Sequence, residues 1–512
     1  MAKMTDHDTD ITQVDAIFTW LAGEPDGDLS IDLAGLRAQF GKFSRLGTKG
    51  PRIGRCLGLF CVRAIDLCGR VEARLVPAAL PLESALYATA VGLVDVLLDI
   101  AANCQRRRDE VRTRWTRTRM DSEGWNAQAL HLVGRAYLLG CMAGMVAPPG
   151  LWHWAHALHL VASRSKAEAE PVRGAVFHYK RLLSMAVVQP ESLTARELLW
   201  LYEYLETMLG DVALAMVPVE SHNVSYWIDI DQDRPPMAIA RQVPPDDSHI
   251  WYFSPTGIAE SVAVQIEKLE DRIMEAEVVG IERHDDLLDS EVTGLPEGLA
   301  PLEALSLLRR LRERWAEPVM RKKERRECHE TVQVCIGLRA VWELGNRGTG
   351  TNDSAQLISP FSEWVAFNKC GDGYALVSSG RVESVLSPGV VLVLRNDETQ
   401  PWTVSVVRWV RSGNPSKVEI GVQVVGRSFN PVRVIFQNSE IRNPHLGLIL
   451  PPMVGLRQSE AILAPAGVCL SRDFVMVHEQ KHLYIAQGRV LQREMQTPAV
   501  EVFQYEVDPY PI

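Results

Sequence analysis

Residues 402–426, WTVSVVRWVRSGNPSKVEIGVQVVG, carry the strongest strand pattern of the chain. Valine and isoleucine recur at strand spacing on both sides of a Gly-Asn-Pro-Ser segment that is typical of a turn. Similar valine-rich runs surround this pair, namely TVQVCIGLRAVWEL, GYALVSS, VVLVLR and VRVIFQ. Six strands within roughly 110 residues predict a small antiparallel β-barrel over residues 320–440.

The rest of the chain divides around this barrel. From about residue 14 to 210 the apolar residues follow helical spacing, which predicts a helical bundle or a repeat-like helical scaffold over residues 1–210. Residues 211–300 predict a mixed α/β connecting region and linker, 301–319 a linking helix, and 441–512 a C-terminal β unit. The sequence therefore predicts a multidomain α+β protein, in which an all-α N-terminal region precedes an antiparallel β-barrel and a C-terminal β extension.

Composition limits the classes of function. The 512 residues exceed what one hydrophobic core usually organises, and the net charge of -10 argues against a general nucleic-acid coat. We expect neither a secretory signal nor membrane insertion, because the start lacks an apolar core and no run of about 18 apolar residues occurs. Cys56, Cys61 and Cys68 lie in apolar helical sequence and predict buried free thiols, which fits a cytoplasmic location.

Positive charge is concentrated just before the first predicted strand. Arg321 and Arg325 form an R-x-x-x-R pattern, which Lys322, Lys323 and Arg326 reinforce. An arginine matches phosphate with its fork, pairs with the O6 and N7 edge of guanine, and stacks on a base. The alternative is a solvated cap at the end of a helix.

A second element follows at FNKCGDGYALV, residues 367–377. Asn368, Cys370 and Gly373 have the spacing N-x-[small]-x-x-G just ahead of a strand. A short acceptor suits the N1 and N2 donors of guanine, a small side chain leaves room for the base, and glycine permits a tight turn beside it.

With these two elements, residues from roughly 320 to 440 resemble the PilZ family, small β-barrels that bind the bacterial second messenger cyclic di-GMP. That family combines R-x-x-x-R on an N-terminal arm with [D/N]-x-S-x-x-G at the entry to a strand. WTVSVVRWVR and EIGVQVVG also look like PilZ barrel strands. Asn368 is the uncharged option, and Cys370 stands where serine is usual. One lost hydrogen bond costs about 1–3 kcal/mol, or about ten- to a hundredfold in affinity.

The resemblance implies a non-enzymatic bacterial receptor whose ligand is cyclic di-GMP, with no catalytic residue, metal or further cofactor. The ligand-binding residues that it implies are Arg321, Lys322, Arg325, Arg326, Asn368, Cys370 and Gly373. We expect the arm at 321–326 to continue the preceding helix, to close over guanines and phosphates, and so to reorient a helical region that contacts an unidentified protein partner. The alternative is a PilZ-like scaffold that binds protein partners and has lost the nucleotide.

Other candidate motifs favour structural interpretations. The seven arginines of 105–120 fit a solvated helix face or partner surface better than an RNA site, so we do not expect nucleic-acid binding. His153, His156 and His159 indicate helix packing, because steps of three residues turn them around the axis. RHDD at 283–286 and GNRGTG at 345–350 indicate a solvated loop and a turn. The sequence contains no HExxH, nucleophile elbow or dinucleotide fingerprint, and it does not indicate which process is regulated.

Overall fold

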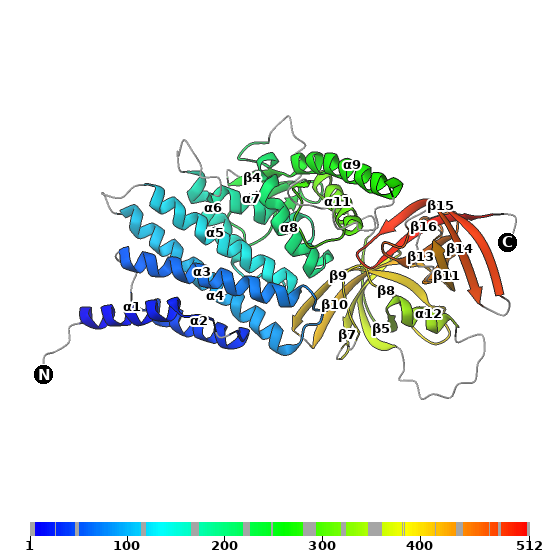
Figure 1. The fold of residues 1–512 in the computed structure, drawn as a ribbon, viewed down its shortest axis with the longest axis horizontal. Coiled ribbons are helices and arrows are strands. Elements are labelled where there is room, and N and C mark those ends of the chain that lie inside the picture. The colour runs from blue at the N-terminus through cyan, green and yellow to red at the C-terminus, as the bar shows by residue number, and fades with distance from the viewer. Residues whose placement is uncertain are drawn as a thin grey trace.

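The computed structural model describes residues 6–508 except 26, 47–50, 114–118, 165–173, 219–225, 247–248, 280–292, 319–323, 347–360, 381, 383, 415, 437–443, 470–471 and 480–482. Within these ranges a helical N-terminal part is followed by a small sheet, the helices α9 and α11, and two β-barrels (Figure 1). The predicted α+β arrangement is confirmed.

The N-terminal part is built from eight α-helices and two short 3-10 helices within the described ranges. They are α1 (Asp6–Ala22), α2 (Leu29–Phe43), α3 (Pro51–Leu75), α4 (Ser84–Thr113), α5 (Arg119–Met142), α6 (Leu151–Ser163), α7 (Ala175–Val187), η1 (Pro190–Ser192), α8 (Ala195–Met208) and η2 (Leu209–Asp211).

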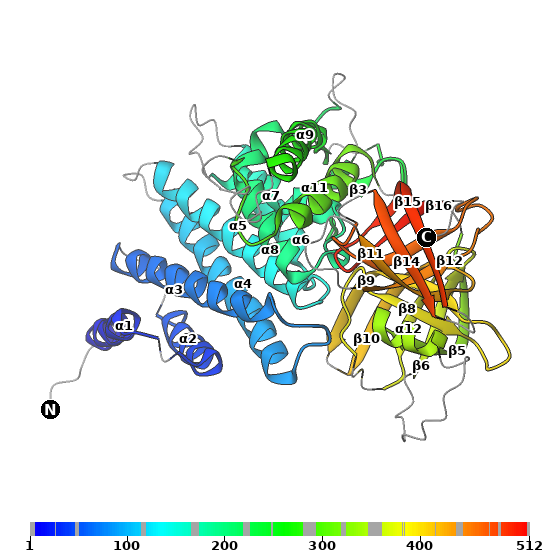
Figure 2. The same cartoon turned by 45° about the vertical axis from the view of Figure 1, so that its right-hand side comes forward.

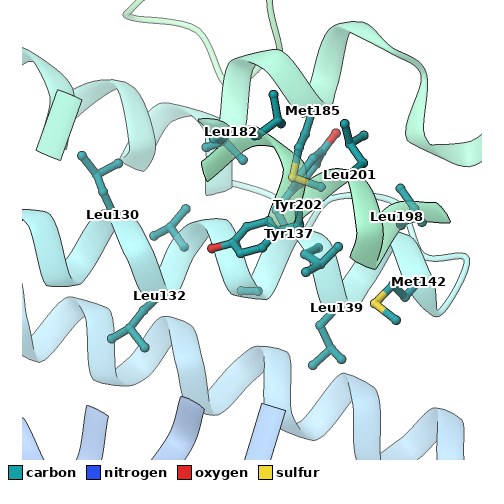
Figure 3. Packing of buried hydrophobic residues seen from close by; sticks show 14 of the residues in the cluster. Leu130, Leu132, Tyr137, Leu139, Met142, Leu182, Met185, Leu198, Leu201 and Tyr202 are labelled. Atoms are coloured by element: carbon teal, nitrogen blue, oxygen red, sulfur yellow. The ribbon is translucent and has the colours of Figure 1, made fainter. Parts of the chain in front are cut away.

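The long helix α5 lies at the centre of this helical part. Tyr137 of α5 lies close to Tyr202 of α8, and Leu182 of α7 and Leu201 of α8 belong to the same buried cluster (Figure 3). The start of α8 is fixed by a capping box, in which the Thr194 hydroxyl accepts from the Glu197 amide and the Glu197 carboxylate accepts from the Thr194 amide. The core is therefore formed by helices that are distant in sequence.

A small antiparallel sheet and two helices complete this half of the molecule. The sheet has the order β1 (Ala213–Ala215), β4 (Ile250–Ser254), β2 (Tyr226–Asp229), β3 (Met237–Ala238), and α9 (Thr256–Val279) and α11 (Pro301–Ala316) follow it. In α11, Leu311 and Trp315 are fully buried in the helical core, and the Trp315 indole N–H donates to the Ser184 carbonyl at 3.1 Å. The predicted linking helix is thus an integral part of the helical core.

The C-terminal half consists of two closed six-stranded barrels. The strands of the first barrel are β5 (Arg326–Ile336), β6 (Ser362–Cys370), β7 (Gly373–Ser378), β8 (Val391–Arg395), β9 (Thr403–Asn414) and β10 (Lys417–Gly426). Those of the second are β11 (Asn430–Phe436), β12 (His445–Leu450), β13 (Ala461–Pro465), β14 (Asp473–Glu479), β15 (Leu483–Gln496) and β16 (Val500–Val507).

The two barrels share one strand connectivity. In each, the first strand pairs with the second and fourth, the third pairs with the sixth, and the sixth pairs with the fifth. Buried residues of both barrels, including Val393, Val404, Leu448 and Val502, form one apolar cluster between them. The C-terminal β extension is therefore a second barrel with the topology of the first, packed against it (Figure 2).

Two details differ from the sequence-based expectation. The run predicted as a strand over 331–344 ends at Ile336, and residues Leu338–Asn346 form the helix α12. Gly337, with φ of 98°, makes the turn, and Val341 of α12 is buried between the barrels. Strand β11, which the sequence-based division assigned to 320–440, pairs within the second barrel. Valine-rich runs alone do not reveal which strands pair.

The helical part contacts the first barrel directly. Leu80 and Leu386 form an isolated β-bridge, and the Ser412 amide of β9 donates to the Gly144 carbonyl at 2.8 Å. Gly144 has φ of 73°, and a Cβ there would meet Leu80 at 3.1 Å. Arg411 forms an ion pair with Glu191 of η1, Nη2 to Oε1 3.1 Å. The end of β9 is thus anchored on the helices.

One described helix, α4, meets the length and composition of a membrane span over Ser84–Glu110. Half of an apolar stretch of 18 residues within that segment is buried inside the fold, and α4 packs against α3 and α5. The core helix of a soluble protein satisfies the same criterion, so the observation is weak evidence for a membrane.

His159 is buried in the helical core and stacks on Tyr179, with ring centroids 4.1 Å apart. Neither ring nitrogen has a hydrogen-bond partner in the part of the chain that the structure describes. Burial lowers the pKa of His159 to about 3 and that of His156 to about 4. In the unfolded chain both histidines become protonated near pH 6.5, whereas in the folded chain they stay neutral down to about pH 4. The free energy of unfolding therefore has its full value above pH 6.5 and falls as the pH drops toward 4.

We therefore predict that His159→Phe, which preserves the ring stack, reduces the acid sensitivity of the fold. The loss in free energy of unfolding between pH 7 and pH 5 becomes smaller by about 2 kcal/mol. Urea denaturation of both proteins at the two pH values measures this difference. An equal loss in wild type and variant would assign the acid sensitivity to other groups.

Candidate functional site

The pairing of β5 with β6 brings the two predicted motifs together. Arg326 lies opposite Lys369, and Glu327 lies opposite Asn368. Arg325, one residue before β5, therefore approaches Cys370, and its side chain and that of Arg326 are exposed. Arg321, Lys322 and Lys323 lie outside the described residues. Of the predicted arm, the described end is adjacent to the second motif.

Side-chain alternation separates two faces at this end of the barrel. Leu376 is in the barrel core, so its neighbour Ala375 projects outward. Asn368 shares the face of its partner Ala375, because the register of β6 shifts between the core residue Ala366 and Asn368. Glu327 shares this outer face with Asn368, as does Arg325 two residues before it, whereas Arg326 and Lys369 belong to the opposite face. Lys369 pairs with Glu330, and this hydrogen bond raises the pKa of the lysine.

Asn368 has a buried side-chain oxygen that lacks a hydrogen-bond donor among the described residues. Its Oδ1 is buried and accepts no hydrogen bond from the described residues. A buried acceptor without a donor costs about 1–3 kcal/mol. The acceptor that the sequence predicted for guanine is therefore present and unused.

Cys370 and Gly373 close the hairpin between β6 and β7. They lie opposite each other, and only Gly371 and Asp372 separate them. The half-buried Cys370 is on the same outer face as Asn368. A Cβ on Gly373 would lie 2.3 Å from the Val422 carbonyl oxygen of β10. Glycine is thus required by the close approach of β10. Gly373 is the first residue of β7 and does not have a positive φ, so the turn that the sequence predicted is not what requires glycine there.

The outer row that begins at Asn368 continues across three further strands. Asn368 lies opposite Ala375, Ala375 opposite Gly421, and Gly421 opposite Trp409. A Cβ on Gly421 would meet the Trp409 indole at 1.9 Å, so the indole lies across Gly421 toward β7. Trp409 is half-buried, which leaves part of the ring accessible.

Trp409 and Gly421 were missed as site residues by sequence reasoning. Both lie in the segments WTVSVVRWVR and EIGVQVVG, which were interpreted as barrel strands only. A tryptophan and a glycine at outward positions of adjacent strands are the signal that could have identified them, but the register had to be known first.

The predicted continuity between the arm and the preceding helix is wrong. Helix α11 ends at Ala316, and Glu317 has an extended backbone with φ of -140° and ψ of 135°. Pro318 follows, and proline disfavours a helical conformation of the residue before it. The arm therefore does not continue α11 as one helix.

The other sequence motifs have structural roles where the structure describes them. Arg107 and Arg108 are buried, which corrects the interpretation of 105–120 as a solvated helix face or partner surface at these two residues, whereas Arg106 is exposed. Arg107 pairs with Glu110 at 3.1 Å, and Arg108 donates to Asn126 at 3.0 Å. Residues 283–286 and 347–350 lie outside the described ranges, and within those ranges no group of three His, Cys, Asp or Glu residues is placed to hold a metal ion.

The second barrel does not repeat the two motifs at the corresponding places. The segment GRSF before β11 has no R-x-x-x-R, and PPMVGLRQSE between β12 and β13 has no [D/N]-x-S-x-x-G. The candidate site therefore belongs to the first barrel.

Two regions of the chain match known protein families. Residues 15–219 match the family described as cyclic-di-GMP receptor FimW, N-terminal domain. Residues 343–431 match the family described as cyclic-di-GMP receptor FimW, middle PilZ domain. The second match includes Asn368, Cys370 and Gly373 and begins after the arm. Neither the curated proteins nor the solved structures gave a match.

The contact between Gly421 and Trp409 gives a test of the outer row. We predict that Gly421→Ala lowers the free energy of unfolding by about 1–3 kcal/mol, because the methyl group displaces the indole. Gly413→Ala, in the neighbouring strand, is the matched control, since nothing lies within 4 Å of its added Cβ. Chemical denaturation measures both. Equal stability of the two variants would contradict the placement of Trp409.

Proposed function

The chain belongs to the PilZ family and carries a FimW-type N-terminal domain, and on this premise we propose that it is a receptor for cyclic di-GMP. The nucleotide lies on the outer row of the first barrel, between the arm and β9. Binding is transmitted through the helical part to a protein partner. The protein acts in the cytoplasm as a binding protein rather than an enzyme.

The buried, unpartnered Oδ1 of Asn368 is the observation that carries this proposal. Guanine offers N–H donors on its Watson–Crick edge, and a carboxamide oxygen accepts from them. Docking a base there satisfies an acceptor that is otherwise buried without a donor, which makes binding more favourable.

The arm supplies the positive charge that two phosphates require. Arg325 is exposed, and the β5–β6 register directs it to the face of Asn368 and Cys370. The proposed site also includes Arg321 and Lys322, outside the described residues, and Arg326, which lies on the opposite face and adds to the local positive field. Gly373 allows β7 and β10 to approach closely beneath the ligand.

The location of the site supports a role in signalling. Strand β9 carries Trp409 on the outer row and, two and three residues later, Arg411 and Ser412 in contact with the helical part. All nine cysteines are free, which agrees with a reducing compartment.

Calorimetric titration with cyclic di-GMP tests the proposal. We predict saturable binding by the full chain and about ten- to a hundredfold weaker binding by Arg325→Ala and by Asn368→Ala. Arg339→Ala is the control, because Arg339 is exposed on α12 and pairs with Glu343 of the same helix. No heat at tens of micromolar nucleotide with wild-type protein would favour the alternative, a scaffold without a ligand.

Substitution of Cys370 is expected to strengthen nucleotide binding, in contrast to the alanine substitutions above. We predict that Cys370→Ser tightens binding by up to about tenfold, because a hydroxyl is a stronger hydrogen-bond donor than a thiol. Cys328→Ser, a half-buried cysteine of the same barrel whose thiol donates to the Ala366 carbonyl, serves as the comparison. Unchanged affinity of Cys370→Ser would remove this side chain from the ligand contacts.

A further inference from the structure

A cavity lies where the helical part meets both barrels. Its volume is about 370 Å³, which is within the range of small-molecule sites. The helical part contributes the first turn of α8 and one face of α11, the first barrel contributes Leu386, and the second barrel contributes residues 496–498. Of the described residues that line the cavity, none belongs to the outer row of the first barrel. The cavity is therefore separate from the candidate nucleotide site.

One face of α11 forms a wall of this cavity. Leu302, Ser306 and Arg310 follow one another at steps of four residues, so their side chains share one helix face, and all three line the cavity. Ser306 is only 5% exposed. The polar groups on this face of α11 are thus directed at the cavity rather than at open solvent.

Two polar atoms on this face lack hydrogen-bond partners. The Ser306 Oγ and the Arg310 Nε are both buried, and neither has a partner in the part of the chain that the structure describes. A serine within a helix commonly donates to the carbonyl four residues earlier, and Ser306 does not make this bond. Buried polar groups are usually satisfied, so two neighbouring exceptions on the wall of one cavity indicate the place of a ligand group.

The acidic side chains at the cavity are already paired with arginines. The pairs are Glu197 with Arg310, Glu303 with Arg196, and Glu191 with Arg411. Glu197 also accepts from the Thr194 amide in the capping box of α8. The first turn of α8 adds the amides of Ala195 and Arg196, which have no acceptor within the helix, and the positive end of the helix dipole. The groups that remain available are donors, and they suit a negatively charged acceptor.

The rest of the lining is mostly apolar. Leu80 and Leu302 come from the helical part, Leu386 and Val410 from the first barrel, and Pro498 from the second. A small inorganic anion would leave this surface in contact with water, whereas a ligand with an apolar body covers it. The lining therefore favours a molecule that combines a charged acceptor with an apolar body.

We propose that this cavity binds a small carboxylate with an apolar body. The carboxylate accepts hydrogen bonds from the Arg310 Nε and the Ser306 hydroxyl beside the first turn of α8. The apolar body packs against Leu80, Leu302 and Leu386. Because the walls come from the helical part and from both barrels, the ligand holds these three parts together. The inference does not depend on the proposed function.

Calorimetric titration of the full chain with 3-phenylpropionate tests the site. We predict saturable binding of one molecule per chain, and binding of 3-phenylpropanol, which has the same body without the charge, that is weaker by about tenfold or more. Acetate, which has the carboxylate without the apolar body, also binds more weakly by about tenfold or more. Saturating 3-phenylpropionate raises the melting temperature, because it binds the folded chain.

Two substitutions test the polar contacts. Arg310→Lys keeps a positive charge beside Glu197 but lacks the Nε–H, and Ser306→Ala lacks the hydroxyl. Each weakens binding of 3-phenylpropionate by about three- to tenfold.

Each substitution has a matched control. Arg309→Lys is the control for Arg310→Lys, because Arg309 does not line the cavity and pairs with Glu270 at 2.7 Å. Ser405→Ala is the control for Ser306→Ala, because the Ser405 Oγ, in β9 and away from the cavity, is likewise buried without a partner among the described residues. Both control variants bind 3-phenylpropionate like wild type, and the melting temperature without ligand checks that every variant is folded.

Three results would overturn the proposal. Absence of saturable heat with 3-phenylpropionate up to about 10 mM would refute the site. Equal affinity of wild type, Arg310→Lys and Ser306→Ala would refute its placement, and equal affinity for 3-phenylpropanol would refute the need for a carboxylate. Arg325→Ala, which we predict to weaken cyclic di-GMP binding, leaves the affinity for 3-phenylpropionate unchanged, so this proposal and the proposed function can fail independently.

Discussion

The register between β5 and β6 is the constraint on which the rest of the site depends. Because Glu327 lies opposite Asn368, the end of the arm is fixed beside the β6–β7 hairpin. If the pairing of β5 with β6 were offset by one residue, Asn368 would point into the barrel core, and Arg325 would no longer lie on the same face as Asn368. Burial of Val332, Val334, Trp364 and Ala366 fixes the register as far as Ala366, and the register shift between Ala366 and Asn368 then turns Asn368 outward. Packing inside the barrel thus positions polar groups outside it.

The same barrel lies between the two other large parts of the molecule. On one side it shares an apolar cluster with the second barrel, and on the other it is anchored to the helices through Leu80, Gly144 and Glu191. Apolar packing holds the two barrels together, whereas the contacts of β9 with η1 are polar and partly exposed. Polar, exposed contacts are cheaper to rearrange than an apolar core. We therefore expect ligand-dependent change at the contact with the helices.

The sequence predicted the elements of the fold better than their spatial relations. Helical spacing, valine-rich runs and turn residues identified the helical part and the barrel, and two short motifs indicated a candidate ligand face on the barrel. The helix α12 was missed because Gly337 ends β5 within an uninterrupted apolar run, and β11 was grouped with the wrong barrel because strand pairing is non-local. Arg107 and Arg108 were taken as solvated because their partners Glu110 and Asn126 are revealed only by packing. Trp409 required the register of four strands.

The central claim is that cyclic di-GMP lies on the outer row of the first barrel, with a guanine at Asn368. A crystal structure of the full chain with the nucleotide tests it most directly. The account predicts a guanine N–H donor within about 3.2 Å of Asn368 Oδ1 and an arm arginine on a phosphate. Nucleotide bound away from β6 and β7, with Asn368 Oδ1 still lacking a donor, would contradict it.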